Sequence, residues 1–154
     1  LQYKDFFFRC SIGKNGLTSH KIEGDKKTPV GIFDLDKLYY RKDLLKKPNT
    51  KLTCVSIEKS MGWCDDLKNI KKYNKLIKIE KKIKHEKLFR FDSKYNLIIP
   101  IKYNFTKPKL GKGSAIFLHI TKNYKPTAGC IAIQEKDFLI LLKLLDKNTK
   151  INIS

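Results

Sequence analysis

The feature that most constrains the fold of this chain is an apolar run that contains a single histidine. Residues 114–120 read Ser-Ala-Ile-Phe-Leu-His-Ile, with five apolar residues around His119. A continuous apolar run of this length is typical of a strand that is buried on both faces. We therefore expect a core strand over residues 114–120, with His119 inside it.

Shorter apolar segments predict further strands, and one segment predicts a helix. The expected strands cover residues 3–10, 30–38, 51–57, 96–103, 129–133 and 150–153. Pro100 indicates that the strand over 96–103 lies at a sheet edge or contains a bulge, because proline cannot donate to a ladder. The apolar side chains from Phe138 to Leu145 follow helical spacing, so a helix is expected over 134–145. The sum is a mostly β fold with one or two helices, closest to a β-sandwich or open barrel, in a single domain over 1–154.

The basic residues outnumber the acidic ones so strongly that binding to a polyanion has to be considered. The 34 Lys and Arg residues against 15 Asp and Glu give a formal net charge of +19. Such a charge attracts nucleic acid, an acidic membrane or an anionic cell wall, or it serves only to keep the chain soluble. The lysines are spread along the whole sequence, without the interleaved arginines and aromatics of a nucleic-acid module. We therefore favour the solubilising role and expect no nucleic-acid partner.

The four cysteines are Cys10, Cys54, Cys64 and Cys130. Their spacing matches no zinc ribbon or finger, so we expect no metal site. A bridge between Cys54 and Cys64 and buried free thiols are both compatible with the sequence. Pairing any two of the first three cysteines would leave Cys130 free. No run of eighteen apolar residues occurs, so no transmembrane segment is expected, and the absence of an initial Met predicts a trimmed form whose signal peptide lies outside this sequence.

Cys130 and His119, separated by ten residues that include a proline and a glycine, form a candidate nucleophile and base. If the strands over 114–120 and 129–133 are neighbours, both side chains can reach one end of the sheet. An imidazole within hydrogen-bond reach takes the proton of a thiol and holds the thiolate, as a cysteine nucleophile requires. The N–H groups of Gly129 and Cys130 are candidate donors to a developing oxyanion. The alternative is a histidine that packs in the core and a cysteine that only fills space.

The motifs around these two residues resemble the L,D-transpeptidase catalytic-domain (YkuD-type) family, in a compact branch of it. The run from Ser114 to His119 and the segment Thr127-Ala128-Gly129-Cys130-Ile131-Ala132 carry the resemblance. Blocks in family order add to it: Lys21-Ile22-Glu23-Gly24-Asp25, Thr28-Pro29-Val30-Gly31-Ile32-Phe33, Tyr40-Arg41-Lys42-Asp43, Gly62-Trp63-Cys64-Asp65-Asp66, Tyr73-Asn74, Glu86-Lys87-Leu88-Phe89-Arg90 and Tyr103-Asn104. Each block is weak alone, and the ordered combination is specific.

The resemblance implies a mostly β fold, a periplasmic or cell-envelope setting and peptidoglycan stem peptides as substrate. It implies that Cys130 attacks the carbonyl of an L-centre in a donor stem and expels the terminal D-residue. An amine of a second stem, or water, then resolves the thioester. His119 acts first as base and then as acid, and no metal or cofactor takes part. The sequence contains no heptad seam, and we expect a monomer.

The chain departs from the broader family at two positions beside the nucleophile. Better-known members have a second His two residues before the Cys and an Arg two residues after it, where this chain has Ala128 and Ala132. We hypothesise that Arg41, or Lys21, replaces the missing cation, because a stem carboxylate needs one and Arg offers a bidentate fork. The alternative for Arg41 is an ion pair with Asp43.

Further substrate-binding candidates are Trp63, Asp65, Asp66, Thr127, Tyr103 and Asn104. Trp63 with the two aspartates would frame a pocket for a diamino-acid ammonium, or it would close a turn in which the aspartates cap backbone N–H groups. Besides transpeptidation, three functions stay open: L,D-carboxypeptidase trimming, a catalytically silent wall-binding module and a basic nucleic-acid-binding protein. The first of these uses the same residues as the transpeptidase, so the sequence does not separate the two.

Overall fold

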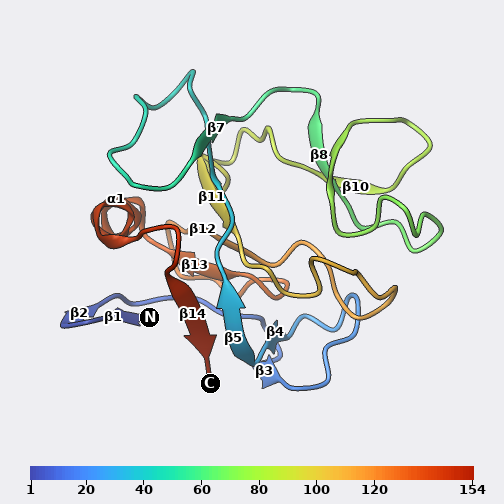
Figure 1. The fold of residues 1–154 in the computed structure, drawn as a ribbon, viewed down its shortest axis with the longest axis horizontal. Helices are drawn as coiled ribbons and strands as arrows, with labels where there is room; N and C mark the ends of the chain where they lie inside the picture. The colour runs from blue at the N-terminus through green and yellow to red at the C-terminus, as the bar shows by residue number, and fades with distance from the viewer.

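The computed structural model describes residues 1–154, and it is mostly β with one helix (Figure 1). The strands are β1 (Gln2–Tyr3), β2 (Phe6–Phe7), β3 (Leu17–Thr18), β4 (Thr28–Pro29), β5 (Gly31–Asp34), β6 (Leu38–Tyr40), β7 (Cys54–Ser56), β8 (Met61–Cys64), β9 (Leu76–Lys78), β10 (His85–Lys87), β11 (Leu97–Pro100), β12 (Phe117–Ile120), β13 (Ile131–Ile133) and β14 (Lys150–Ile153). The helix is α1 (Glu135–Leu144). The expected mostly β fold is confirmed.

The largest sheet has five strands in the order β13-β12-β11-β6-β7. Strand β11 runs antiparallel to both β12 and β6, whereas β13 is parallel to β12 and β7 is parallel to β6. The segments that contain His119 and Cys130 are therefore neighbours in this sheet, as the sequence analysis supposed. A three-stranded sheet, β10-β8-β9, lies at the other end of the molecule from α1 (Figure 1).

Helix α1 covers one face of the five-stranded sheet, and its predicted spacing is confirmed. Glu135 and Asp137 in its first turn and Lys143 in its last turn complement the helix dipole. The core on this side includes Leu97, Ile99, Leu118, Ile120, Ile131, Ile133, Phe138, Leu141, Leu142 and Leu145. Burying a side chain of this kind contributes about 1.5–3 kcal/mol. This face, which holds the larger of two apolar clusters, is therefore the main source of hydrophobic stabilisation.

A second apolar cluster lies on the opposite face, because successive side chains of a strand project to opposite sides. It comprises Tyr39, Ile57, Trp63, Leu88, Tyr95, Ile98, Phe117 and Cys130. The indole of Trp63, on β8, packs edge-on against the ring of Phe117, on β12, with ring centroids 5.3 Å apart. Through such contacts the three-stranded sheet is held against the five-stranded one.

The structure corrects two details of the expected strands. Residues 3–10 are not one strand: Lys4, with a φ of 51°, reverses the chain between β1 and β2. Strand β11 is not at an edge, since it lies between β12 and β6. Pro100 is tolerated there because it is the last residue of β11, beyond the pairing of Leu97 and Ile98 with β6.

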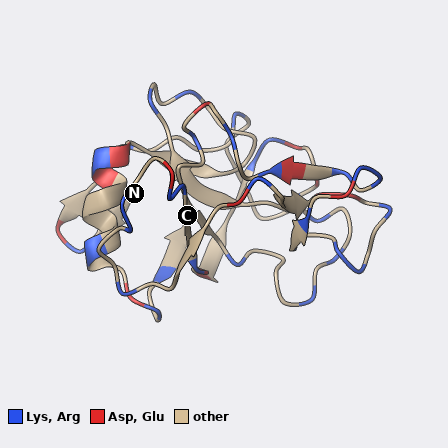
Figure 2. Ribbon diagram, turned by 90° about the horizontal axis from the view of Figure 1, so that it is seen from above, with Lys and Arg blue, Asp and Glu red and all other residues tan.

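The basic residues do not gather on one element. Figure 2 shows Lys and Arg on loops at both ends of the ribbon as well as on the helix. No helix of the structure is long and apolar enough to cross a membrane. All four cysteines are free thiols, so the bridge considered between Cys54 and Cys64 is not formed.

Candidate active site

The register of two neighbouring strands places Cys130 and His119 on the same face of the large sheet. His119 of β12 lies opposite Ala132 of β13. Cys130 precedes Ala132 by two residues, and side chains two residues apart project to the same side. That side is the one opposite α1, which agrees with the packing of Cys130 in the cluster around Phe117.

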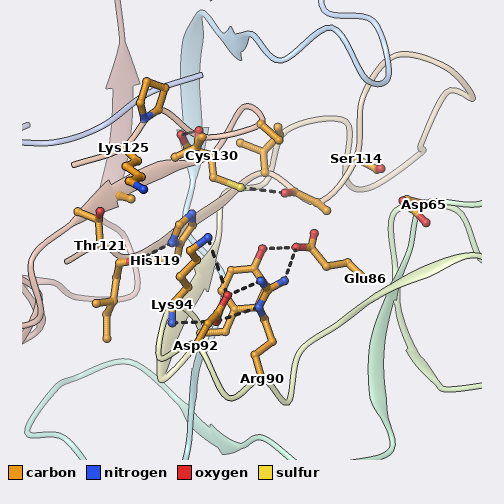
Figure 3. Close-up of a pocket in the computed structure, with 18 of the residues that line it drawn as sticks. Asp65, Glu86, Arg90, Asp92, Lys94, Ser114, His119, Thr121, Lys125 and Cys130 are labelled. Atoms are coloured by element: carbon orange, nitrogen blue, oxygen red, sulfur yellow. Dashed lines mark hydrogen bonds and ion pairs between the residues drawn. The ribbon is translucent and has the colours of Figure 1, made fainter. Parts of the chain in front are cut away.

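Both side chains line one pocket with a volume of about 560 Å³. In Figure 3 the thiol and the imidazole point into it from the strands, and charged side chains face them from the segment around β10 and β11. Its ionisable lining residues are Lys21, Glu23, Asp65, Glu86, Arg90, Asp92, Lys94, Tyr95, His119, Lys122, Lys125 and Cys130. The pocket thus contains the predicted nucleophile and base together with acidic and basic side chains.

The Cys130 thiol is hydrogen-bonded to backbone and not to a side chain. Its Sγ–H donates to the carbonyl oxygen of Ala115 at 3.3 Å, and the sulfur accepts the N–H of Phe117 at 3.4 Å. Burial, and to a lesser degree the charge of Glu86, raise the pKa of the thiol to about 12, against smaller opposing effects of the Phe117 N–H and the Lys21 charge. At neutral pH Cys130 is therefore a protonated thiol.

The imidazole of His119 is buried and oriented by the backbone. Nδ1 lies 2.9 Å from the carbonyl oxygen of Ile120, which can only accept, so Nδ1 carries the proton and Nε2 has its lone pair free. Burial, together with the charges of Lys94 and Arg90, lowers the pKa of His119 to about 4, although the hydrogen bond to the Ile120 carbonyl opposes this shift. His119 is therefore a neutral base at physiological pH, in the protonation state that can accept a thiol proton.

Tyr95 and Glu86 extend the site beyond the predicted pair. The Tyr95 ring packs edge-on against the His119 imidazole, with centroids 5.3 Å apart, and its hydroxyl donates to the Glu86 carboxylate. Arg90 places its guanidinium 4.9 Å from the Tyr95 ring centroid and pairs with Asp92. Together these contacts fix the wall of the pocket that faces the imidazole.

The turn before β13 is built around Thr127. Its hydroxyl accepts the N–H of Gly129 at 3.1 Å and donates to the carbonyl oxygen of Cys130 at 2.6 Å. Glycine is needed at 129 because its φ is 140° and a Cβ would lie 2.8 Å from the Lys27 carbonyl oxygen. The backbone N–H of Cys130 donates to no protein acceptor, whereas that of Gly129 is already occupied by Thr127.

The structure brings only some of the predicted binding residues to this pocket. Lys21, Asp65 and Thr127 line it. Trp63, Asp66, Tyr103, Asn104 and Arg41 do not. Trp63 is buried beneath the site, and its indole N–H donates to Asn74 at 2.9 Å. The ammonium of Lys21 is held by Asp25 at 2.5 Å.

Arg41, the first candidate to replace the missing family cation, lies outside the pocket. Its guanidinium pairs bidentately with Asp43, stacks 3.6 Å from the Phe89 ring centroid and donates to the carbonyl oxygen of Arg90. The ion pair with Asp43, considered as the alternative, is the arrangement that the structure has. Because Arg41 holds the backbone at Arg90, it supports the pocket wall without reaching the cavity.

Sequence reasoning missed the residues of the wall opposite the sheet. Glu86, Arg90, Lys94 and Tyr95 line the pocket, yet none was assigned a role. The block Glu86-Lys87-Leu88-Phe89-Arg90 was a signal, since it belongs to the pattern that carries the family resemblance. No group of three or more His, Cys, Asp or Glu side chains is arranged to hold a metal ion.

The fold is mostly β, and Cys130 and His119 lie on one sheet face and line one pocket, which is the arrangement that a cysteine acyltransferase would need. The model of the YkuD family, the L,D-transpeptidase catalytic domain, matches residues 3–153. The chain therefore belongs to the L,D-transpeptidase catalytic-domain family, whose members act on peptidoglycan. No curated protein and no solved structure matches the chain.

Proposed function

We propose that this chain is a peptidoglycan L,D-transpeptidase that forms an acyl-enzyme at Cys130. The observation that carries the proposal is the placement of Cys130 and His119 on one sheet face in one pocket. The family match over nearly the whole chain supports peptidoglycan as the substrate. The setting of such a reaction is the periplasm or another compartment of the cell envelope.

In the first half-reaction the thiol proton passes from Cys130 Sγ to His119 Nε2. For this the Sγ–H leaves the Ala115 carbonyl, and the sulfur attacks the carbonyl carbon of an L-centre in the donor stem. The N–H of Cys130, which has no protein acceptor, is the donor best placed for the developing oxyanion. The imidazolium then returns its proton to the departing amine of the terminal D-residue.

In the second half-reaction an amine of another stem attacks the thioester. His119 takes the proton of that amine and gives a proton back to Cys130 as the sulfur leaves. Water in place of the amine would produce a trimmed stem, which is the carboxypeptidase outcome. The open, charged pocket accommodates either acceptor, so product analysis has to separate them.

Lys21 is the residue that we propose for a stem carboxylate in place of the absent family arginine. It lines the pocket and lowers the pKa of Cys130 through its charge. A carboxylate at this point would compete with Asp25 for the ammonium. Arg41 has no such access, since its guanidinium is engaged with Asp43 outside the cavity.

The test is mass spectrometry of disaccharide-tetrapeptide muropeptides incubated with the wild-type protein and with Cys130→Ala. We expect cross-linked dimers with the wild type alone, with fragmentation showing the attacked stem position. Loss of a terminal residue without dimers would replace transpeptidation by trimming. Unchanged muropeptides in both samples, or equal turnover by the two proteins, would overturn the proposal and favour a silent wall-binding module.

A further inference from the structure

The backbone of Ala115 has an unusual conformation next to the nucleophile. Its φ is 51°, in the left-handed region that a residue with a Cβ rarely adopts. This conformation directs its carbonyl oxygen at the Cys130 thiol, which donates to it at 3.3 Å. A conformation of this kind persists only where the surrounding structure holds it in place.

The group that holds Ala115 is the side chain of Asn74, in the turn between β8 and β9. Its Oδ1 accepts the N–H of Ala115 at 3.0 Å and the indole N–H of Trp63 at 2.9 Å. Its Nδ2 donates to the carbonyl oxygens of Tyr103 and Asn104 at 3.1 and 2.7 Å. Asn74 is 3% exposed and every hydrogen-bonding position of its carboxamide is occupied, so its orientation is fixed.

The neighbouring residues reinforce this arrangement. Tyr73 and Ser114, which adjoin Asn74 and Ala115 in the chain, both donate to the carboxylate of Glu23. The backbone around Ala115 is thus held by two successive residues of the β8–β9 turn, one directly and one through Glu23. No contact of this network involves the predicted base.

We propose that Asn74 is a positioning residue that keeps the resting nucleophile protonated by fixing the Ala115 carbonyl against Cys130 Sγ. A carbonyl that accepts from the thiol stabilises the neutral form and places its negative end next to any thiolate. The thiol is released when the sulfur turns from this carbonyl to the imidazole of His119. The inference rests on the proposed function for its catalytic meaning and concerns the same cysteine.

Other groups act on the same sulfur and have to be kept constant in a test. Glu86 from β10 and Tyr95 before β11 face it with raised pKa values, and His119 of β12 is neutral. Lys21, from the loop before β4, contributes a positive charge. Substitutions at Asn74 leave all four of these side chains unchanged, so a change in thiol reactivity would report on the carbonyl.

The experiment measures the rate of iodoacetamide alkylation of Cys130 from pH 6 to pH 10, resolved from the other three cysteines by peptide mass spectrometry. The main variant is Asn74→Gly, because Asn74 itself has a φ of 54° and glycine removes the carboxamide without backbone strain. We expect alkylation about tenfold faster at pH 8, which corresponds to a fall of about one pKa unit.

The matched control is Asn104→Gly. Asn104 also has a positive φ, and its side chain donates to the carbonyl oxygens of Lys109 and Gly113 without contacting Ala115. Its Cys130 alkylation profile should match the wild type. Equal acceleration by both glycine variants, or an unchanged rate in Asn74→Gly, would overturn the proposal. Because alkylation needs no peptidoglycan substrate, these outcomes are independent of whether the muropeptide assay succeeds.

A second measurement covers the case in which Asn74→Gly does not fold. The Raman difference spectrum between the wild type and Cys130→Ala isolates the S–H stretch of Cys130. We expect a band lowered by hydrogen bonding to a carbonyl and still present at pH 9. A spectrum without that band at pH 9 would contradict a thiol held protonated by Ala115.

Discussion

The two main sheets contribute to the active site in opposite ways. The five-stranded sheet positions Cys130 and His119, the proposed nucleophile and base, and its strands β11, β12 and β13 are buried along their whole length. In the three-stranded sheet only β8 is mostly buried, whereas β9 and β10 are half-buried or exposed and the connecting loops are rich in lysine. This sheet supplies Glu86 to the pocket and, from the turn before β9, Asn74 to the backbone beside Cys130. The proposed reactive pair and the polar groups proposed to tune the thiol thus come from different sheets.

The comparison shows what burial does to the ionisable groups on the large sheet. The apolar sheet positions Cys130 and His119 through register, but it also raises the thiol pKa to about 12 and lowers the imidazole pKa to about 4. Both groups are therefore neutral at rest. The polar side chains of the smaller sheet and its flanking segments surround them on the other side of the pocket, where they can respond to substrate charge.

The largest effect is expected from removing the base on the large sheet. His119→Ala should lower turnover of muropeptides by about a hundred- to ten-thousand-fold, since general-base assistance is of that size. His85→Ala is the matched control on the small sheet: its imidazole contacts the Ile83 carbonyl and does not line the pocket. Steady-state rates that fall equally in both variants would contradict the assignment of the base.

Truncating apolar side chains should lower the free energy of unfolding by different amounts in the two sheets. Phe138→Ala removes a fully buried ring from the α1 side and should cost about 3–5 kcal/mol of unfolding free energy. Ile77→Ala, at a half-buried position of β9, should cost less than about 2 kcal/mol. Urea denaturation of the two variants measures the difference, and equal losses would break the contrast between the sheets.

The depressed pKa of His119 predicts that stability depends on pH. Between about pH 6.5 and pH 4 the unfolded chain binds a proton at this imidazole that the folded protein excludes. Stability is therefore complete above pH 6.5 and falls as the pH drops toward 4, by on the order of 3 kcal/mol. Urea denaturation at pH 7 and pH 4.5 should show this loss in the wild type and a reduced loss in His119→Gln.

The smallest effect, on the reactivity of the Cys130 thiol, is expected from replacing Glu86, the carboxylate that the three-stranded sheet supplies to the pocket. Glu86→Gln removes a charge that raises the pKa of Cys130 while keeping an acceptor for the Tyr95 hydroxyl. Cys130 should be alkylated about threefold faster at pH 8, which corresponds to about half a pKa unit. Glu80→Gln, at an exposed ion pair with Lys72, should leave the rate unchanged. A slower rate in Glu86→Gln would show that the carboxylate acts in another way.

A central strand of the large sheet, the helix and the C-terminal strand could be predicted from the sequence. The apolar run around His119, the spacing from Phe138 to Leu145 and the alternation over 150–153 all correspond to observed elements. Each pattern reflects the burial of one short segment, so the element can be predicted from a few consecutive residues. The pairing of the His119 and Cys130 segments was only a condition at the level of the sequence, and the structure shows it as the parallel pair β12–β13.

The rest of the site was decided by contacts between distant segments. Asn74 meets Ala115 across 41 residues, and Arg41 reaches the carbonyl of Arg90 across 49. No local pattern distinguishes such an asparagine from one in any turn, nor an arginine that pairs with its neighbour from one that faces a cavity.

The sequence by itself therefore determined the apolar strands and the helix, and it predicted the two residues that we propose as nucleophile and base. Only the tertiary structure decided that the thiol rests on a backbone carbonyl, that Lys21 and not Arg41 lines the pocket, and that Glu86 and Tyr95 complete its wall. The physical reason is the sequence distance between interacting residues. Apolar periodicity depends on residues within one element, whereas the function of a polar side chain depends on partners that are distant in sequence and become neighbours only in the folded protein.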